Sequence, residues 1–146
     1  MILKMKKVRE AAQIPKRATD GAAAADLCAC TPLEGVLLAP GERTLIPTGI
    51  AIELPSEDYV ALIFARSGLG TKKGVSLSNG VGVIDSDYRG EVHVGLINHS
   101  SEGYTIQNGE RIAQLAVMPV IPFEVELCEE LSGSARGEKG LGSTGK

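Results

Sequence analysis

Short runs of aliphatic and β-branched residues, separated by glycine and proline, dominate the hydrophobic pattern of this chain. These runs predict strands over residues 44–54, 59–64, 75–78, 91–98 and 111–120. Turn-forming residues recur between them, among them Pro40-Gly41, Gly74 and Gly109. Because many short strands with frequent turns are typical of a sandwich, a jelly roll or a barrel, we expect an all-β fold.

Residues 21–30, GAAAADLCAC, form the one long stretch with weak strand character. Their alanines favour helix. The stretch is short, however, and it lies between the turn-forming sequences Thr19-Asp20-Gly21 and Thr31-Pro32, which limit any helix there.

The most informative stretch, residues 79–95, has the sequence NGVGVIDSDYRGEVHVG and contains several candidate site residues. Two apolar runs flank a polar turn, and this spacing predicts a β-hairpin. The turn presents Asp85, Asp87 and Tyr88, and because loops on a rigid frame often carry function, its tip is a candidate site. The alternative is a solvated hairpin whose acids only keep it soluble. The two predicted arms consist of Val81, Val83 and Ile84 and of Val92, Val94 and Leu96.

The composition narrows the class of protein. A chain of 146 residues is long enough for one domain with a substantial core. Hydrophobic residues make up 43% but aromatic residues only 3%, so the core must be built from Ala, Val, Ile and Leu. A formal net charge of −3 argues against a protein that grips nucleic acid by its net charge, but it leaves room for a local basic pocket that binds a small anion.

No apolar run approaches the roughly 18 residues of a membrane span, and the basic N-terminus lacks the apolar region of a secretory signal. We therefore expect a cytoplasmic protein that contacts neither membrane nor nucleic acid. The cysteines Cys28, Cys30 and Cys128 fit neither a disulfide framework nor zinc spacing, so buried free thiols are expected.

The last residues, 131–146, are rich in Gly and Ser and have few apolar side chains to bury, so we expect a flexible tail. Its end, GLGSTGK, matches part of a phosphate-loop motif, but that motif requires a preceding strand and a following helix that the pattern does not supply. Exposed backbone N–H groups and the charges of Arg136, Lys139 and Lys146 could still fold over a polyphosphate. The alternative is a disordered tail.

Two further segments have open interpretations. The sequence ARSGLG, residues 65–70, follows a predicted strand and offers an arginine, a hydroxyl and two glycines, which suit either a phosphate contact or a surface turn. The sequence GERIAQL, residues 109–115, could be an ordinary edge strand with a polar turn.

Taken in chain order, five segments closely resemble the five motifs of the trimeric dUTP pyrophosphatase (dUTPase) family. The order and spacing of the set make it specific, and IDSDYRG is its strongest part. The segments are AAADL at residues 23–27, ARSGLG at 65–70, SNGVGVIDSDYRGEV at 78–92, GERIAQL at 109–115 and RGEKGLGSTG at 136–145.

This resemblance implies a distorted, β-clip-like jelly roll over residues 1–131. It implies a flexible C-terminal arm over residues 132–146 that closes the active site of a neighbouring subunit. The assembly would be a homotrimer whose active sites are shared between subunits.

The resemblance also implies hydrolysis of dUTP to dUMP and pyrophosphate, by attack of water on the α-phosphorus. This reaction would keep uracil out of DNA and supply dUMP for thymidylate synthesis. Mg²⁺ would be the cofactor, held by phosphate oxygens and water with no direct protein ligand, and Asp26 would support it through water.

Individual roles follow from the same resemblance. Asp85 matches the general base, whereas Asp87, Glu110 and Arg111 are assigned to structure. Tyr88 would pack on the deoxyribose and exclude a 2′-hydroxyl. The residues expected at the base and sugar are Asn79, Val83, Ile84, Tyr88 and His93. The residues expected at the phosphates are Arg66, Ser67, Gly68, Gln114, Arg136, Gly142, Ser143 and Thr144.

Two positions depart from the family pattern. Ala24 and Ala25 precede Asp26 where the family commonly has Gly-Tyr, which should cost packing rather than chemistry. Leu141 replaces the phenylalanine that stacks on uracil, so Leu141 can cover the base but cannot stack on it. We expect weaker closure of the arm as a result.

Three alternatives stay open at this point. One is a dCTP deaminase on the same fold, and another is a nucleotide-gated regulatory protein. The third is a structural trimer without activity, which the complete set of motifs disfavours.

Overall fold

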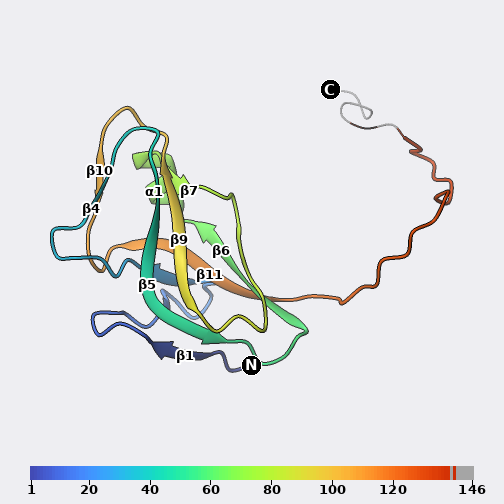
Figure 1. Ribbon diagram of the computed structural model, residues 1–146, viewed down its shortest axis with the longest axis horizontal. Helices are drawn as coiled ribbons and strands as arrows, with labels where there is room; N and C mark the ends of the chain where they lie inside the picture. The colour runs from blue at the N-terminus through green and yellow to red at the C-terminus, as the bar shows by residue number, and fades with distance from the viewer. Residues whose placement is uncertain (139, 141–146) are drawn as a thin grey trace.

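Two antiparallel sheets face each other across the core (Figure 1). The structure, a computed structural model, describes residues 1–138 and 140. The four-stranded sheet has the order β1 (Lys4–Lys7), β5 (Arg43–Glu53), β9 (Glu91–Asn98) and β7 (Val75–Leu77). The five-stranded sheet has the order β2 (Lys16–Arg17), β3 (Ala25–Cys28), β11 (Arg111–Pro119), β6 (Tyr59–Ala65) and β8 (Gly82–Ile84).

Two smaller elements complete the described part of the chain. Strands β4 (Val36–Leu38) and β10 (Tyr104–Ile106) form a separate two-stranded ribbon. The helix α1 (Ser67–Lys73) follows β6 and ends at Gly74, which adopts the left-handed conformation that favours glycine. The predicted all-β jelly-roll class is therefore confirmed, with one short helix.

The period-two pattern accounts for the long strands. Along β9, each second residue is buried, and the predicted strands over residues 44–54, 59–64, 75–78, 91–98 and 111–120 agree with β5, β6, β7, β9 and β11 to within one residue at each end. The buried apolar side chains are aliphatic or small, as the composition predicted. The largest of them are Leu27, Leu38, Ile46, Ile50, Leu96, Ile106 and Ile112.

The observed local structure differs from the interpretation of the sequence at three places. The alanine-rich stretch over residues 21–30, whose structure the sequence left undecided, contains a strand, β3, because β2 and β11 pair with it on both sides and outweigh its helical preference. The segment after β6, interpreted as either a phosphate contact or a surface turn, forms the helix α1, whose Leu69 is buried. The predicted hairpin does not form, because β8 pairs with β6 whereas β9 pairs with β5 and β7.

The cysteine prediction holds only in part. All three thiols are free, and Cys30 is buried and Cys28 partly buried. Cys128 is exposed, because it lies beyond the last strand, where no sheet covers it.

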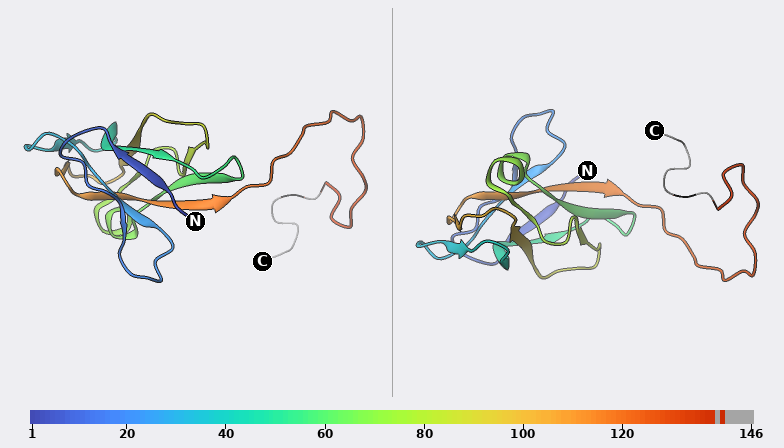
Figure 2. Two further views of the ribbon diagram at one scale, coloured as in Figure 1. Left: turned by 90° about the horizontal axis from the view of Figure 1, so that it is seen from below. Right: turned by 90° about the horizontal axis from the view of Figure 1, so that it is seen from above.

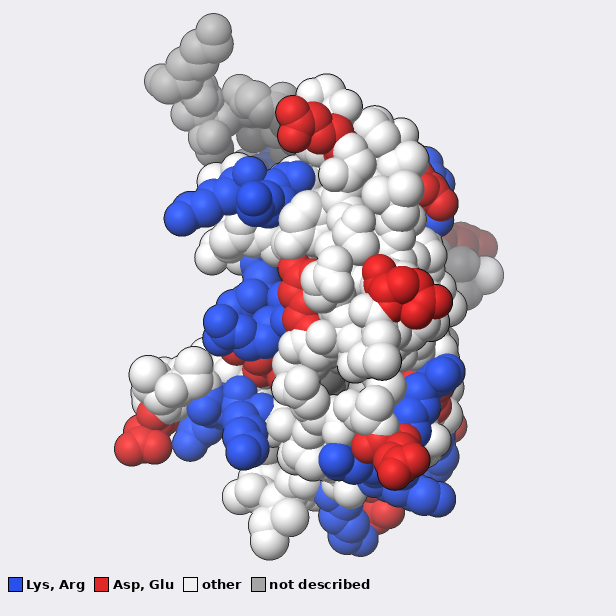
Figure 3. Space-filling model, turned by 90° about the vertical axis from the view of Figure 1, so that its left-hand side faces the viewer, with Lys and Arg blue, Asp and Glu red and all other residues white. Residues whose placement is uncertain are grey.

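Beyond Pro119, residues 120–138 contain neither strand nor helix and run away from the two sheets (Figure 2). Among the described residues, no helix is long and apolar enough to cross a membrane. On the face shown in Figure 3, Lys and Arg side chains are interspersed with Asp and Glu side chains, so this face offers no uniform charge to a polyanion.

A glycine-dependent bulge in β5 positions the strand pair that supports the site. The register between β5 and β9 shifts between Pro47 and Ala51, and Gly49 has φ +71° at the bulge. A Cβ at Gly49 would lie 2.5 Å from the Cβ of Ala12, which is buried. Because Ala12 has no flexible side chain that could move aside, only glycine fits at position 49.

We expect Gly49→Ala to lower the free energy of unfolding by more than about 2 kcal/mol, because strain and collision add. Gly41→Ala is the matched control: Gly41 has φ +75°, but a Cβ added there would have nothing within 4 Å, so this variant should lose only the strain of about 1 kcal/mol. Denaturant unfolding at equal protein concentration measures both. Equal losses would contradict the steric role of Ala12.

Candidate active site

The turn over residues 85–90 crosses from the five-stranded sheet to the four-stranded sheet. Because its flanking strands pair with different partners, they diverge, and a cavity of about 280 Å³ lies between them. Apolar side chains and two carboxylates line it. The lining residues are Leu45, Val83, Ile84, Asp85, Tyr88, Glu91, Val92 and His93.

The cavity brings together most of the residues expected at the base and sugar. Asp85 and four of the five predicted base and sugar residues line it, but Asn79 does not. Asn79 is exposed in the loop before β8, and Asp85 directly follows the last residue of that strand. Sequence reasoning did not assign Leu45, Glu91 or Val92 to the site. Leu45 reaches the cavity because β5 pairs with β9, which no local pattern reveals.

Tyr88 folds back over the turn onto the start of β9. Its hydroxyl donates to the peptide oxygen of Glu91 at 2.8 Å, and its backbone N–H donates to the oxygen of Asp85 at 3.2 Å. A Cβ at Gly90 would collide with the Tyr88 hydroxyl and would lie 2.6 Å from the ring carbon Cζ. The glycine that ends IDSDYRG is therefore required because the tyrosine ring occupies the space above it.

The acidic residues of the turn are held by their backbone and not by ion pairs. The Arg89 guanidinium donates to the peptide oxygens of Ser86 at 2.7 Å and of Tyr88 at 3.0 Å. Asp85 and Asp87 are exposed, and neither forms a salt bridge with any described residue. The Asp85 carboxylate is thus available to a water molecule or a substrate.

Glu91 is the most strongly held acid of the cavity. Its carboxylate accepts from Arg9 Nε at 2.7 Å, from Arg9 Nη2 at 3.0 Å and from the Gly49 N–H at 2.7 Å. The hydrogen bond from Arg9, assisted by that from Gly49, lowers the pKa of the Glu91 carboxyl despite its burial. His93 lies alongside, with Nδ1 3.0 Å from the Glu91 peptide oxygen.

A second cluster lies where β3, β11 and β6 run side by side. Arg66 Nε donates to Asp26 Oδ1 at 3.0 Å, and Arg111 Nη1 donates to Asp26 Oδ2 at 3.2 Å. Arg66 also donates through Nη1 to the Arg111 peptide oxygen at 3.0 Å. Gln114 pairs with Asp26 on one side and with Phe64 on the other. Asp26, Arg66 and Gln114, predicted from separate motifs, thus belong to one cluster.

The residues after Arg66 continue this cluster into α1. Ser67 and Gly68 are the first two residues of the helix, and both are exposed. Arg136 is exposed in the segment that leaves the sheets. Leu141, Gly142, Ser143 and Thr144 lie outside the described residues.

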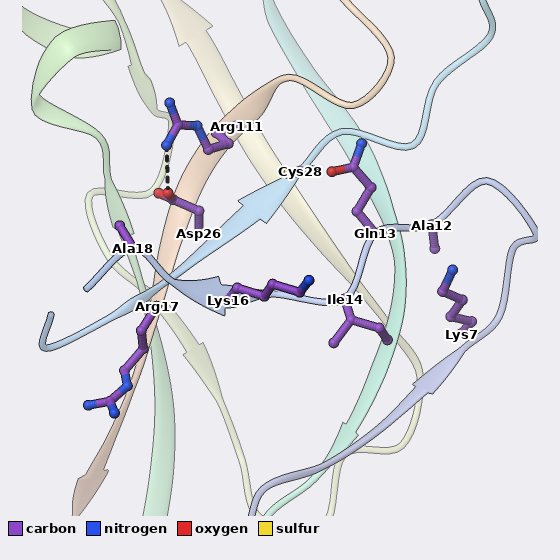
Figure 4. A pocket seen from close by; sticks show the side chains of 10 residues that line it. All are labelled: Lys7, Ala12, Gln13, Ile14, Lys16, Arg17, Ala18, Asp26, Cys28 and Arg111. Atoms are coloured by element: carbon purple, nitrogen blue, oxygen red, sulfur yellow. Dashed lines mark hydrogen bonds and ion pairs between the residues drawn. The ribbon is translucent and has the colours of Figure 1, made fainter. Parts of the chain in front are cut away.

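A larger cavity, of about 550 Å³, adjoins the Asp26 cluster, with the ion pair between Asp26 and Arg111 on its wall (Figure 4). Lys7, Lys16 and Arg17 add positive charge to its lining. Within residues 1–138 and 140, no three His, Cys, Asp or Glu side chains are grouped to hold a metal ion. A divalent cation here would need its ligands from elsewhere, such as a bound triphosphate and water.

The two clusters lie at opposite ends of β6. Ile84, next to Asp85, pairs with Ala61, whereas Gln114 pairs with Phe64. Asp85 and Gln114 are therefore offset by four residues along the strands and by two strand spacings across them, or about 16 Å between Cα atoms. Their side chains are too short to contact one water molecule within a single chain.

The fold and the site define an all-β sandwich that carries a partly apolar cavity and, apart from it, an arginine cluster suited to an anion. Comparison with known proteins specifies the family. The sequence model of the dUTPase family matches residues 10–145. The chain is 51% identical over 137 residues to deoxyuridine 5′-triphosphate nucleotidohydrolase of Neisseria meningitidis serogroup B, covering 94% of this chain and 91% of that protein. The chain belongs to the dUTPase family.

Solved structures agree with this assignment. The dUTPase of Staphylococcus bacteriophage 80alpha with dUPNHPP superposes with a TM-score of 0.89 at 31% identity, covering 99% of each chain. A point variant of the dUTPase from phage phi11 of S. aureus, described with a structural Mg(II) ion, has a TM-score of 0.81 at 25% identity and covers 91% of this chain and 100% of that chain.

We expect the Glu91 carboxylate to make stability depend on pH. Since its pKa is lowered in the folded protein, its contribution is complete above the ordinary glutamate pKa of about 4.3 and is lost as the pH falls through the lower folded value. The difference in thermal midpoint between the wild type and Glu91→Gln should therefore shrink as the pH falls below the ordinary glutamate value of about 4.3.

Glu53→Gln is the matched control. Lys4 also lowers the pKa of the Glu53 carboxyl, but that pair is exposed to solvent and should contribute little at any pH. A constant difference between Glu91→Gln and the wild type as the pH falls would contradict the assignment.

Proposed function

We propose that the cavity between β8 and β9 binds the uracil and deoxyribose of dUTP, and that Asp85 directs water onto the α-phosphorus. The chain is a dUTP diphosphatase by its family membership; the roles of its residues are the proposal. The observation that carries it is the cavity itself, because a volume of about 280 Å³ suits a nucleoside but not a whole triphosphate, and the unpaired Asp85 lines it.

The reaction needs one proton acceptor. Asp85 would take a proton from the attacking water, whose oxygen bonds to the α-phosphorus while the bond from that phosphorus to the bridging oxygen breaks. Pyrophosphate leaves and dUMP remains. The exposed position of Asp85 lets water reach it before the substrate closes the site.

Selection of the deoxyribose and the base would occur in the same cavity. The Tyr88 ring, fixed to Glu91 by its hydroxyl, leaves no room for a 2′-hydroxyl if the sugar packs against it. Backbone groups of Val83 and Ile84, together with His93, would meet the uracil edge. Asn79 would approach the base from the loop before β8.

The Asp26 cluster is suited to the phosphates. Asp26 holds Arg66 by its Nε, which leaves Nη2 of Arg66 without a partner among the described residues. Ser67, Gly68 and Gln114 would add neutral donors, and Arg136, Gly142, Ser143 and Thr144 would come from the arm. Leu141 would cover the base.

The residues fit a magnesium ion carried by the triphosphate. Each Asp26 oxygen accepts one hydrogen bond from an arginine, so each keeps a lone pair for a water of the hydrated ion. Mg²⁺ would supply charge neutralisation for the leaving pyrophosphate.

We further propose that the working unit is a homotrimer, because one chain separates Asp85 from Gln114 by about 16 Å. The outer face of the five-stranded sheet is apolar where it should contact a second copy. Buried Ala61 and Ile63 alternate with outward positions along β6, and β8 and β11 continue that outward row. The apolar outward side chains are Val60, Leu62, Phe64, Val83, Ala116 and Met118.

The segment after Pro119 supports the same assembly. Large apolar side chains occupy every second position from 121 to 127. These residues, Ile121, Phe123, Val125 and Leu127, are between 84% and 97% exposed. A period of two is the pattern of a strand with one buried face. This segment would add to a sheet of a neighbouring subunit, and the arm, residues 132–146, would continue to that subunit's site.

A dCTP deaminase is not supported, since relatives about half identical are named for dUTP. We expect purified protein with Mg²⁺ to convert dUTP, but not dCTP, dTTP or UTP, into the monophosphate and pyrophosphate. Asp85→Asn should lower kcat by about 10² to 10⁴. Chromatography of the products measures both.

Asp87→Asn is the control, because Asp87 is an exposed acid of the same turn and should keep kcat within about twofold. Equal losses in the two variants would show that the turn, and not the Asp85 carboxylate, matters. Turnover of UTP at the rate of dUTP would contradict the role of Tyr88.

A further inference from the structure

One peptide oxygen holds both polar rings of the nucleoside cavity. The oxygen of Glu91 accepts from the Tyr88 hydroxyl at 2.8 Å, and it lies 3.0 Å from Nδ1 of His93. The positions of these two rings therefore depend on how firmly Glu91 is fixed at the start of β9.

Glu91 is fixed through its side chain by an arginine from outside the cavity. Arg9 lies between β1 and β2, contacts the carboxylate through two nitrogens, and is absent from the cavity lining. The third donor is the N–H of Gly49 at the β5 bulge. The Glu91 side chain is only 15% exposed, so loss of Arg9 would leave a largely buried carboxylate with the Gly49 N–H as its hydrogen-bond donor and Nε2 of His93 3.6 Å away.

The segment that carries Arg9 is itself attached to the bulge. The N–H of Val8 donates to the oxygen of Gly49 at 2.8 Å, and Ala12 packs where a Cβ of residue 49 would lie. Arg9 thus has a defined position relative to β5, from which its planar guanidinium can orient Glu91.

We propose that Arg9 is a positioning residue for nucleoside binding: by clamping Glu91 it holds Tyr88 and His93 in the orientation that receives the deoxyribose and base. This inference rests on the proposed function of the cavity. Arg9 belongs to none of the five motifs that resemble the family.

The clamp should act on the nucleoside half of the substrate alone. When Glu91 is free to move, binding must order the Tyr88 ring, a cost that corresponds to about threefold to tenfold weaker affinity. The Asp26 cluster has no contact with Arg9 or Glu91, so phosphate binding should not change.

Calorimetric titration with dUMP and, separately, with pyrophosphate and Mg²⁺ tests this split, at a temperature where circular dichroism shows each variant folded. Arg9→Ala should bind dUMP about threefold to tenfold more weakly and pyrophosphate unchanged. Arg9→Lys, which keeps the charge but not the two-nitrogen contact, should fall between Arg9→Ala and the wild type. Glu91→Gln serves as the second variant, with a loss in the same direction.

Lys4→Ala is the matched control, since Lys4 also joins the N-terminal segment to a glutamate, Glu53, and neither Lys4 nor Glu53 lines the cavity. It should bind dUMP like the wild type. Unchanged dUMP affinity in both Arg9→Ala and Glu91→Gln, or an equal loss of pyrophosphate binding, would overturn the positioning role.

The variant Tyr88→Ala distinguishes failure of the Arg9 clamp from failure of the proposed nucleoside site. If Tyr88→Ala weakens dUMP binding but the Arg9 and Glu91 variants do not, the cavity binds the nucleoside and only the clamp is refuted. If Tyr88→Ala also leaves dUMP affinity unchanged, the assignment of the cavity is refuted and the clamp with it.

Discussion

The site depends on the division of β8 and β9 between two sheets. A turn that joins paired strands brings their side chains together, whereas the turn over residues 85–90 joins strands held apart by other partners. The backbone hydrogen bonds to β6 on one side and to β5 and β7 on the other prevent the cavity from collapsing. Tyr88 and Glu91 then close the turn side of this space without filling it.

The same order of strands separates Asp85 from the cluster around Asp26. Strands β3, β11 and β6 are neighbours, and this brings Asp26, Gln114 and Arg66 together although they come from three distant parts of the sequence. Asp85 lies near the opposite end of β6, next to Ile84, which pairs with Ala61. A rigid sheet cannot shorten that distance, so the proposed nucleoside cavity and the proposed phosphate cluster would serve one substrate only if they come from different copies of the chain.

The sequence is most informative where a pattern is local. Period-two alternation predicts β5, β6, β9 and β11 because one face of each strand is buried. It cannot predict partners, so it places Val83 and Val92 in one hairpin although they lie in different sheets. The helix α1 escapes prediction because its two glycines disfavour helix, while burial of Leu69 and the left-handed Gly74 stabilise it.

The residues of the candidate site likewise divide into those within local motifs and those brought there by long-range pairing. The five motifs in order propose Asp85, Tyr88, Arg66 and Gln114 as site residues, because each motif is a short local segment. Leu45 and Arg9 lie in no motif, and each reaches the site only through long-range pairing, at β5 or across the β5 bulge. Residues that reach a site only through long-range pairing can be recognised only from the three-dimensional structure.

Complementation between inactive chains tests most directly whether sites are shared. Asp85→Asn and Gln114→Ala chains, each inactive alone, would be co-expressed in equal amounts and the mixed protein assayed for dUTP hydrolysis. Random assembly of shared sites predicts that about one quarter of the sites combine an intact Asp85 with an intact Gln114 from another chain, so activity returns to about that fraction of the wild type. Activity no greater than that of either variant alone would mean that each chain holds a complete site, and would contradict the account.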